Sequence, residues 1–227
     1  MPARTRRLID YGSWRRALLA LLCLPLVSLA DTAANREIKQ VLALAPDAEH
    51  GGELFGQCAA CHGPDGGGTT DGAIPRIAGQ HYRVLVRQVV NFRLGKRWDM
   101  RMEGVATSHE VMPELQDIAD VAHYASELGT DGARGIGDGV HAANGARIYS
   151  QQCASCHGRE GEGSDAKEIP RLAGQHAAYL ARQIYDAVDG RRPELTRSHG
   201  KRLESLDFED VLGLSDYLAR IGWQEKR

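Results

Sequence analysis

Two C-x-x-C-H pentapeptides, at residues 58–62 and 153–157, are the clearest chemical signal in this 227-residue chain. This motif attaches a c-type haem, because its two thiols bond to the porphyrin and the adjacent histidine ligates the iron. Zinc ribbons also use C-x-x-C pairs, but their second pair follows about 15–20 residues after the first. Here the second motif lies 95 residues after the first. We therefore predict two covalent haem c groups, and the attachment and proximal-ligand residues are Cys58, Cys61, His62, Cys153, Cys156 and His157.

The start of the chain predicts export. Residues 1–16 carry five arginines and one aspartate, and an apolar run from Ala17 to Leu29 follows, with small residues at Ser28 and Ala30. The 13-residue run is short for a membrane span, which needs about 20 residues. We predict a signal peptide at 1–30 and a periplasmic mature chain, and a retained N-terminal anchor is the alternative.

The mature chain is mildly acidic. Without residues 1–30 it holds 23 basic and 29 acidic residues, a net charge of −6. The absence of a basic stripe argues against nucleic acid as a partner. The four cysteines that remain all belong to the haem motifs, so no thiolate is left for other chemistry. We expect redox proteins as partners, membrane-bound or periplasmic, and peripheral association with a membrane stays open.

The two halves of the chain repeat each other. An offset of 95 superposes IPRIAGQH at 74–81 on IPRLAGQH at 169–176. A half of about 85 residues rarely buries enough apolar surface alone, so a covalent haem would complete each core. The glycine-rich stretch 130–139 is typical of a linker. We predict domains at 31–129, with an extension at 31–46, and at 140–227.

Helical periodicity predicts an all-α fold. Tyr82, Leu85, Val89 and Phe92 follow at steps of 3, 4 and 3, which indicates an amphipathic helix that stops at Gly95. The segments that close each half have similar apolar faces, and strand patterns are absent from the sequence.

Each half resembles a class I cytochrome c domain, and the tandem resembles the di-haem cytochrome c4 family over roughly residues 47–223. The haem motifs are the basis for the resemblance to class I cytochrome c, and the repeated P-R-[I/L]-A-G-Q run is the basis for the resemblance to the di-haem cytochrome c4 family. The resemblance implies a pseudo-twofold pair of domains with adjacent haem edges. It also implies that the Pro75 and Pro170 carbonyls accept hydrogen bonds from His62 and His157, which fixes each imidazole and raises its basicity. A simple turn at each proline is the alternative.

The distal iron ligand is where the sequence departs from this family. The family normally places a methionine there, yet no methionine follows Met112. A Ser-His pair recurs in both halves, ending at His109 and His199, 47 and 42 residues after the proximal histidines. We predict bis-His ligation through His109 and His199.

Other side chains compete for these roles. Met112 is the main rival at the first haem, with core packing as its other role. His109 and His199 are alternatively capping or propionate-binding residues over an open iron. Arg97 and Arg192 match across the halves and either pair with propionates or are solvated. The weaker rivals as distal ligands are Met100, Met102, His81 and His176.

Bis-His ligation predicts a low-potential electron carrier. A methionine ligand raises a haem potential, and axial ligands together with their surroundings cover about 0.8 V. A six-coordinate iron has no open site, so we expect outer-sphere transfer of one electron and no enzymatic activity. The alternative is a di-haem redox enzyme, peroxidase-like or acting on sulfur compounds, with one open or exchangeable haem site.

Overall fold

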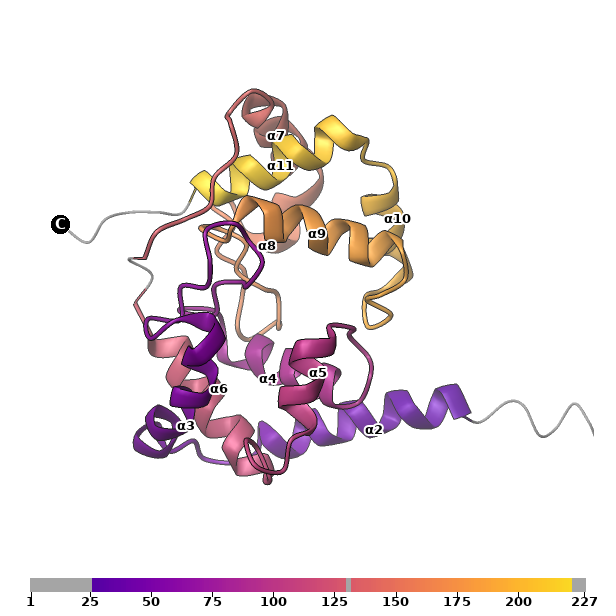
Figure 1. Cartoon of the computed structure of the whole chain (residues 1–227). Helices are drawn as coiled ribbons and strands as arrows, with labels where there is room; N and C mark the ends of the chain where they lie inside the picture. The colour runs from indigo at the N-terminus through magenta and orange to yellow at the C-terminus, as the bar shows by residue number, and fades with distance from the viewer. Residues whose placement is uncertain (1–25, 130–131, 222–227) are drawn as a thin grey trace, which may run out of the picture.

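The structure is a computed structural model that describes residues 26–129 and 132–221, and these residues form two helical domains (Figure 1). The first domain contains α2 (Leu26–Val41), α3 (Ala48–His62), α4 (Tyr82–Arg93), α5 (Met100–Thr107) and α6 (Leu115–Glu127). The second contains α7 (Ala142–Ile148), the π-helix η1 (Tyr149–Cys153), α8 (Ala154–His157), α9 (Ala177–Val188), α10 (Arg197–Glu204) and α11 (Phe208–Arg220). Within the described ranges the only β pairing is an isolated bridge between Ser164 and Ile169, so the all-α prediction is confirmed.

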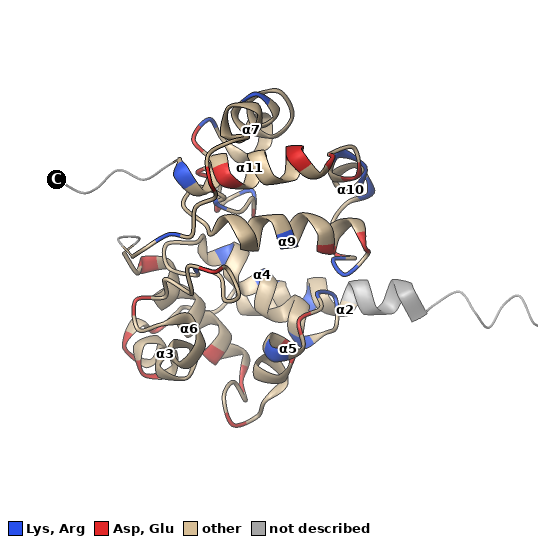
Figure 2. Ribbon diagram, turned by 45° about the horizontal axis from the view of Figure 1, so that its top comes forward, with Lys and Arg blue, Asp and Glu red and all other residues tan. Residues whose placement is uncertain are grey.

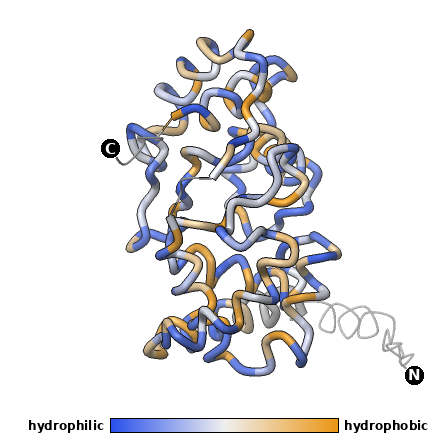
Figure 3. Tube along the Cα trace, turned by 60° about the vertical axis from the view of Figure 1, so that its left-hand side comes forward, coloured by the Kyte–Doolittle hydropathy of each residue, from blue (hydrophilic) through white to orange (hydrophobic). Residues whose placement is uncertain are grey.

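Each domain has its own apolar core, and hydrophobic and hydrophilic residues alternate along the trace of both (Figure 3). In the first domain α3 packs on α6, and α4 packs on α5 and α6. In the second domain α11 packs on α7 and α9. The second core is smaller: its fully buried members are Ile148, Tyr149, Leu180, Ile184, Val211, Leu214 and Leu218.

The N-terminal extension is a helix that belongs to the first domain. α2 packs on α4 and α6, and it buries Ala34, Ile38 and Val41. It begins at Leu26, inside the predicted signal peptide, of which residues 1–25 lie outside the described part of the chain. Among the described helices, none is long and apolar enough to cross a membrane.

The repeated octapeptide joins the two domains through a reciprocal pair of glutamine side chains. Gln175 accepts a hydrogen bond from the Arg76 N–H (3.0 Å) and donates one to the Arg76 carbonyl (2.8 Å). Gln80 makes the same two bonds with the backbone of Arg171, both at 2.9 Å. Each glutamine thus satisfies backbone groups that the joint would otherwise leave unpaired, which is costly in a buried place.

The histidine that ends each octapeptide also crosses the domain boundary. His81 Nε2 donates to the Glu162 carbonyl, and His176 Nε2 donates to the Gly67 carbonyl, both at 2.8 Å. His176 is fully buried, and its Nδ1 accepts from the Gly135 N–H at 3.0 Å. Both ring nitrogens of His176 are therefore engaged within the protein, which leaves neither for a metal.

The described part of the predicted linker, 132–139, is held by both domains: Arg76 of the first domain donates to the Gly132 and Ala133 carbonyls, and the end of the segment is tied to the second domain. Asp216 accepts hydrogen bonds from the N–H groups of Gly137 (2.8 Å) and Gly139 (2.7 Å). Asp216 is buried, and its pKa is lowered by the hydrogen bonds it accepts from Arg220 and from this backbone, against the opposing effect of burial. An ionised Asp216 therefore fixes the end of the linker against α11.

Candidate haem sites

The first C-x-x-C-H motif lies on the last turn of α3. The helix ends at Gly63, whose φ of +79° is a conformation that glycine adopts without strain. His62 is buried, and its Nδ1 donates to the Pro75 carbonyl at 2.9 Å. Burial lowers the pKa of His62, so its Nε2 is an unprotonated, correctly oriented metal donor at neutral pH.

The second motif repeats this proximal arrangement. α8 ends at His157, and Gly158 follows with a φ of +86°. His157 Nδ1 donates to the Pro170 carbonyl at 3.2 Å, and burial lowers the pKa of its ring. The two motifs differ in the turn that precedes them. In the second domain this turn is the π-helix η1, whereas in the first domain α3 is a regular α-helix up to His62.

The cysteines suit thioether attachment better than a thiolate metal site. All four sulfurs are free, with Cys61 and Cys156 exposed and Cys58 and Cys153 half-buried. Burial raises the pKa of Cys58 to about 11, which disfavours its thiolate. In the described ranges, no group of three or more His, Cys, Asp or Glu side chains is placed to hold a metal ion. The zinc alternative therefore finds no support.

His199 faces His157 across the distal side of the second domain. The centroids of the two rings are 6.3 Å apart, and the ring planes are inclined by 33°. His199 lies on the first turn of α10, where the Thr196 hydroxyl accepts a hydrogen bond from its backbone N–H at 3.3 Å. The pKa of His199 is lowered by burial and then by the proximity of His157, so the ring is neutral.

In the first domain α5 packs on α4, as α10 packs on α9 in the second, and Met102 stands at the same distance from its helix cap as His199. Both α5 and α10 have eight residues. Asp99 accepts a hydrogen bond from the Met102 N–H at 3.4 Å, as Thr196 does from His199, so each residue is the third after its cap. The Met102 side chain is half-buried and packs against the first core.

The other candidate ligands in the first domain lie elsewhere. His109 is exposed, in the turn after α5, and Met100 is 88% exposed. Met112 is buried in the apolar core, the second role that the sequence allowed it. The two Ser-His pairs are not structural equivalents, because Ser108 ends α5 whereas Ser198 lies inside α10. The helix caps, Asp99 and Thr196, align Met102 with His199 instead.

Arg97 is buried between the domains, and Arg192 near it is half-buried. Arg97 is 8% exposed, and its partners are all neutral: Gln88 (2.6 Å), Tyr179 (2.6 Å) and Gln183 (2.5 Å). Burial lowers the pKa of Arg192, and so does the nearby charge of Arg97, while Glu194 pairs with Arg192 at 2.9 Å. A buried charge needs a counter-charge. Two guanidiniums beside one carboxylate therefore suit the carboxylate groups of a haem.

Comparisons with known proteins find relatives over most of the chain. A family model described as Cytochrome c matches residues 48–128 and again 142–221. The chain is 32% identical over 193 residues to cytochrome c4 of Stutzerimonas stutzeri, covering 77% of this chain and 89% of that protein. It is 29% identical over 181 residues to the thiosulfate dehydrogenase electron acceptor of S. stutzeri (strain A1501), covering 74% and 80% of the two chains.

Solved structures show the same likeness. Reduced recombinant cytochrome c4 from Pseudomonas stutzeri superposes with a TM-score of 0.68 at 30% identity, covering 78% of this chain and 100% of that one. The as-isolated thiosulfate dehydrogenase from Marichromatium purpuratum gives a TM-score of 0.67 at 31% identity, covering 77% of this chain and 40% of that one.

Proposed function

Because the chain belongs to the cytochrome c family and carries two haem c groups, we propose that it shuttles single electrons between redox proteins in the periplasm. Bound haem supplies a one-electron ferric/ferrous couple. One observation carries this proposal. Each domain has a histidine that is oriented by a proline carbonyl, and a second possible iron donor on the first turn of α5 or α10. Sites filled on both sides favour outer-sphere transfer over substrate chemistry.

For the second domain we propose that His157 and His199 are the two axial ligands. A metal–imidazole bond is about 2 Å long, so two imidazoles on opposite sides of one metal have centroids about 6 Å apart. The observed separation of 6.3 Å fits this arrangement. The neutral state of both rings supports it, because only an unprotonated nitrogen can bind iron.

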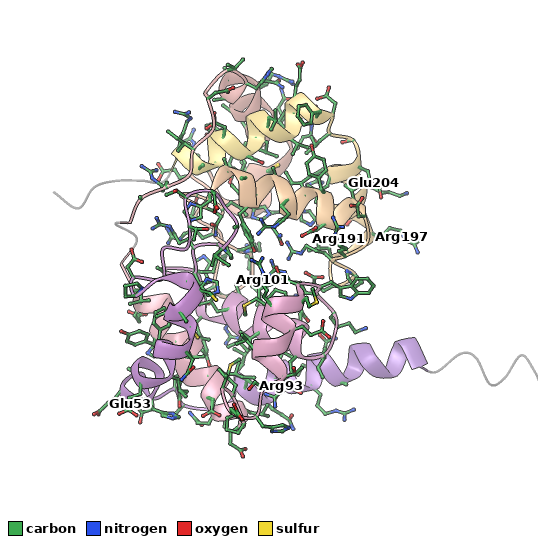
Figure 4. All side chains as sticks on the ribbon, in the orientation of Figure 1. Glu53, Arg93, Arg101, Arg191, Arg197 and Glu204 are labelled. Atoms are coloured by element: carbon green, nitrogen blue, oxygen red, sulfur yellow. The ribbon has the colours of Figure 1, made fainter. Side chains whose placement is uncertain are left out.

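For the first domain we propose His62 and Met102, in place of the His109 that the sequence suggested. The shared cap geometry of α5 and α10 supports Met102, and the exposure of His109 gives it no comparable position. Arg101, the neighbour of Met102, acts electrostatically on both His62 and Cys61, which places this turn of α5 beside the first haem motif. Figure 4 shows Arg101 near the gap between the domains.

Unequal ligands make the two domains electronically unequal. A thioether opposite histidine raises a haem potential relative to a second imidazole. An electron on the protein therefore rests mainly in the first domain, and the second domain hands electrons to it. The buried Arg97 and the half-buried Arg192 would hold the haem carboxylates at the joint between the domains.

The setting of this shuttle follows from the predicted signal peptide and from the named relatives. The N-terminal sequence 1–30 supports export, although its first 25 residues lie outside the described structure. Relatives described as thiosulfate dehydrogenase electron acceptors suggest that a sulfur-oxidising enzyme is one class of electron donor. An enzymatic role for this chain itself has no comparable support, since its mature cysteines all lie in the haem motifs.

Absorption and low-temperature EPR spectra of the ferric protein test the ligands. We expect two low-spin irons and a weak red methionine-to-iron band of single-haem intensity. Met102→Ala should abolish that band, His199→Ala should make the other iron high-spin, and His109→Ala, the matched control, should change neither. Loss of a low-spin signal in His109→Ala, with the band absent from the wild type, would instead establish bis-His ligation at both irons.

A further inference from the structure

The distal helices of the two domains differ sharply in charge at their surfaces. α10 carries Arg197, Lys201 and Arg202 against a single acid, Glu204, and all four are exposed. In the described residues none of these three cations forms an ion pair, and Arg202 donates only to the Gln152 carbonyl, at 2.8 Å. Figure 2 shows this basic end of the second domain, and Figure 4 shows Arg197 projecting away from the body of the molecule.

The corresponding surface of the first domain is neutralised. On α5 the single cation, Arg101, pairs with the capping Asp99 at 3.1 Å, and Glu103 adds a negative charge. The first domain as a whole, residues 31–129, holds 9 basic and 14 acidic residues. The cations of α10 therefore stand out on a molecule that is otherwise acidic.

These cations lie directly behind the proposed iron ligand. An α-helix turns by about 100° per residue, so the residues two before and two after His199 lie about 160° from it. Those residues are Arg197 and Lys201, which share the outer face of α10 while His199 faces His157. A protein seated on this face would be separated from the His199 ring by the thickness of one helix, about 10 Å.

An apolar contact is available next to this charge. α11 begins four residues after α10 ends, and Phe208 and Leu212, one turn apart on it, are 66% and 40% exposed. Stable interfaces combine an apolar centre with a polar, charged rim. Exposed aromatic and aliphatic side chains beside three unpaired cations match that composition.

We propose that the outer face of α10, with Phe208 and Leu212 beside it, is the docking surface for an acidic redox protein that passes electrons to the second haem. The proposal rests on the proposed function, because it needs the second haem behind His199. One electron leaves the reduced partner and reduces the ferric protein, with no bond made or broken. Charge complementarity steers the encounter, while the acidic remainder of the molecule repels the same partner from other faces.

Stopped-flow reduction of the ferric holoprotein by reduced flavodoxin, an acidic one-electron donor, tests this surface. The test variant is Arg197→Glu with Lys201→Glu. The matched control is Arg36→Glu with Lys39→Glu on α2, which makes the same change in net charge at two exposed residues of the first domain. At low ionic strength we expect the α10 variant to react about tenfold more slowly than wild type and the α2 variant to stay near wild type. At high ionic strength the three rates should converge.

Equal slowing of both variants, or a wild-type rate that does not fall with salt, would overturn the proposal. Hexaammineruthenium(II), a cationic donor, should reduce the α10 variant at least as fast as wild type, which separates a charge effect from damage to the site. If the double variant loses its low-spin spectrum, Lys201→Gln, at a residue with no side-chain partner among the described residues, replaces it, with a smaller loss of rate expected. Failure of the ligand assignment would appear in the spectra of Met102→Ala and His199→Ala, whether or not salt affects the rate.

Discussion

α5 and α10 occupy equivalent positions in their domains, yet they are held differently. α5 buries Ala106 completely, and the loop that follows it places Met112 in the first core. α10 buries no residue, and it is held by packing on α9, by Leu203 against the second core, by its Thr196 cap and by the bond from Arg202 to the Gln152 carbonyl. The proximal sides, in contrast, are nearly identical, with the same histidine-to-proline bond in both.

This contrast shows which part of a repeated domain is free to diverge. The proximal histidine and its carbonyl are fixed by the attachment chemistry, so both copies keep them. In the proposed sites the distal helix supplies one donor atom from its first turn, and a cap three residues earlier positions the Met102 thioether in one domain and the His199 imidazole in the other. The chemistry of the site can therefore change at one residue while the fold stays the same.

An exchange of distal ligands should give the largest effect. His199→Met should raise the potential of the second haem by on the order of 0.1–0.3 V, part of the range of about 0.8 V that axial ligands and surroundings cover. The two steps of a spectroelectrochemical titration should then move together. Met102→His is the complementary variant, and it should lower the potential of the first haem to near that of the second. Two coincident high-potential steps in the wild type would contradict the unequal pair.

The two glutamines between the domains make the same number of hydrogen bonds but differ in burial, so their alanine variants test how burial affects the stability that these bonds provide. Gln175→Ala and Gln80→Ala each remove two bonds to the backbone of the other domain and one from the N–H of the following histidine, but Gln175 is buried whereas Gln80 is half-buried. Gln175→Ala should cost about 2–3 kcal/mol in the free energy of unfolding, and Gln80→Ala about half of that. Urea unfolding of the ferric holoprotein measures both, and equal losses would show that burial does not decide the cost.

The smallest expected effect is a pH dependence that His176 contributes. Burial lowers its pKa below 6.5, so the unfolded chain takes up the proton more readily than the folded one. The neutral His176 ring therefore contributes fully to the free energy of unfolding above pH 6.5. This contribution is lost as the pH falls from 6.5 through the lowered pKa, by up to about 1.4 kcal/mol per pH unit. Thermal unfolding at pH 7.5, 6.5 and 5.5 should show a flatter profile for His176→Gln than for wild type. An unchanged slope would mean that the pKa of this ring is the same in the folded and unfolded states.

The sequence by itself determined the covalent chemistry and the class of fold. Two C-x-x-C-H motifs specify haem attachment because the spacing is local, within a single helical turn. The apolar periods predicted helices, as found, and the repeat of 95 residues predicted two domains, which the family model matches at 48–128 and 142–221. The lack of any methionine after Met112 already excluded a methionine from the second half as ligand of the second haem.

Only the tertiary structure decided which residues meet across each site. The Ser-His repeat aligned His109 with His199, but loops of unequal length separate α5 and α10 from the helices that follow them, and in the structure His109 lies in the exposed turn after α5 whereas His199 lies within α10. The sequence left Arg97 as either a propionate partner or a solvated residue and His176 as a rival ligand, whereas contacts between the domains bury both, together with Gln175. Their roles depend on packing between segments about 100 residues apart, and no local pattern of residues encodes that contact.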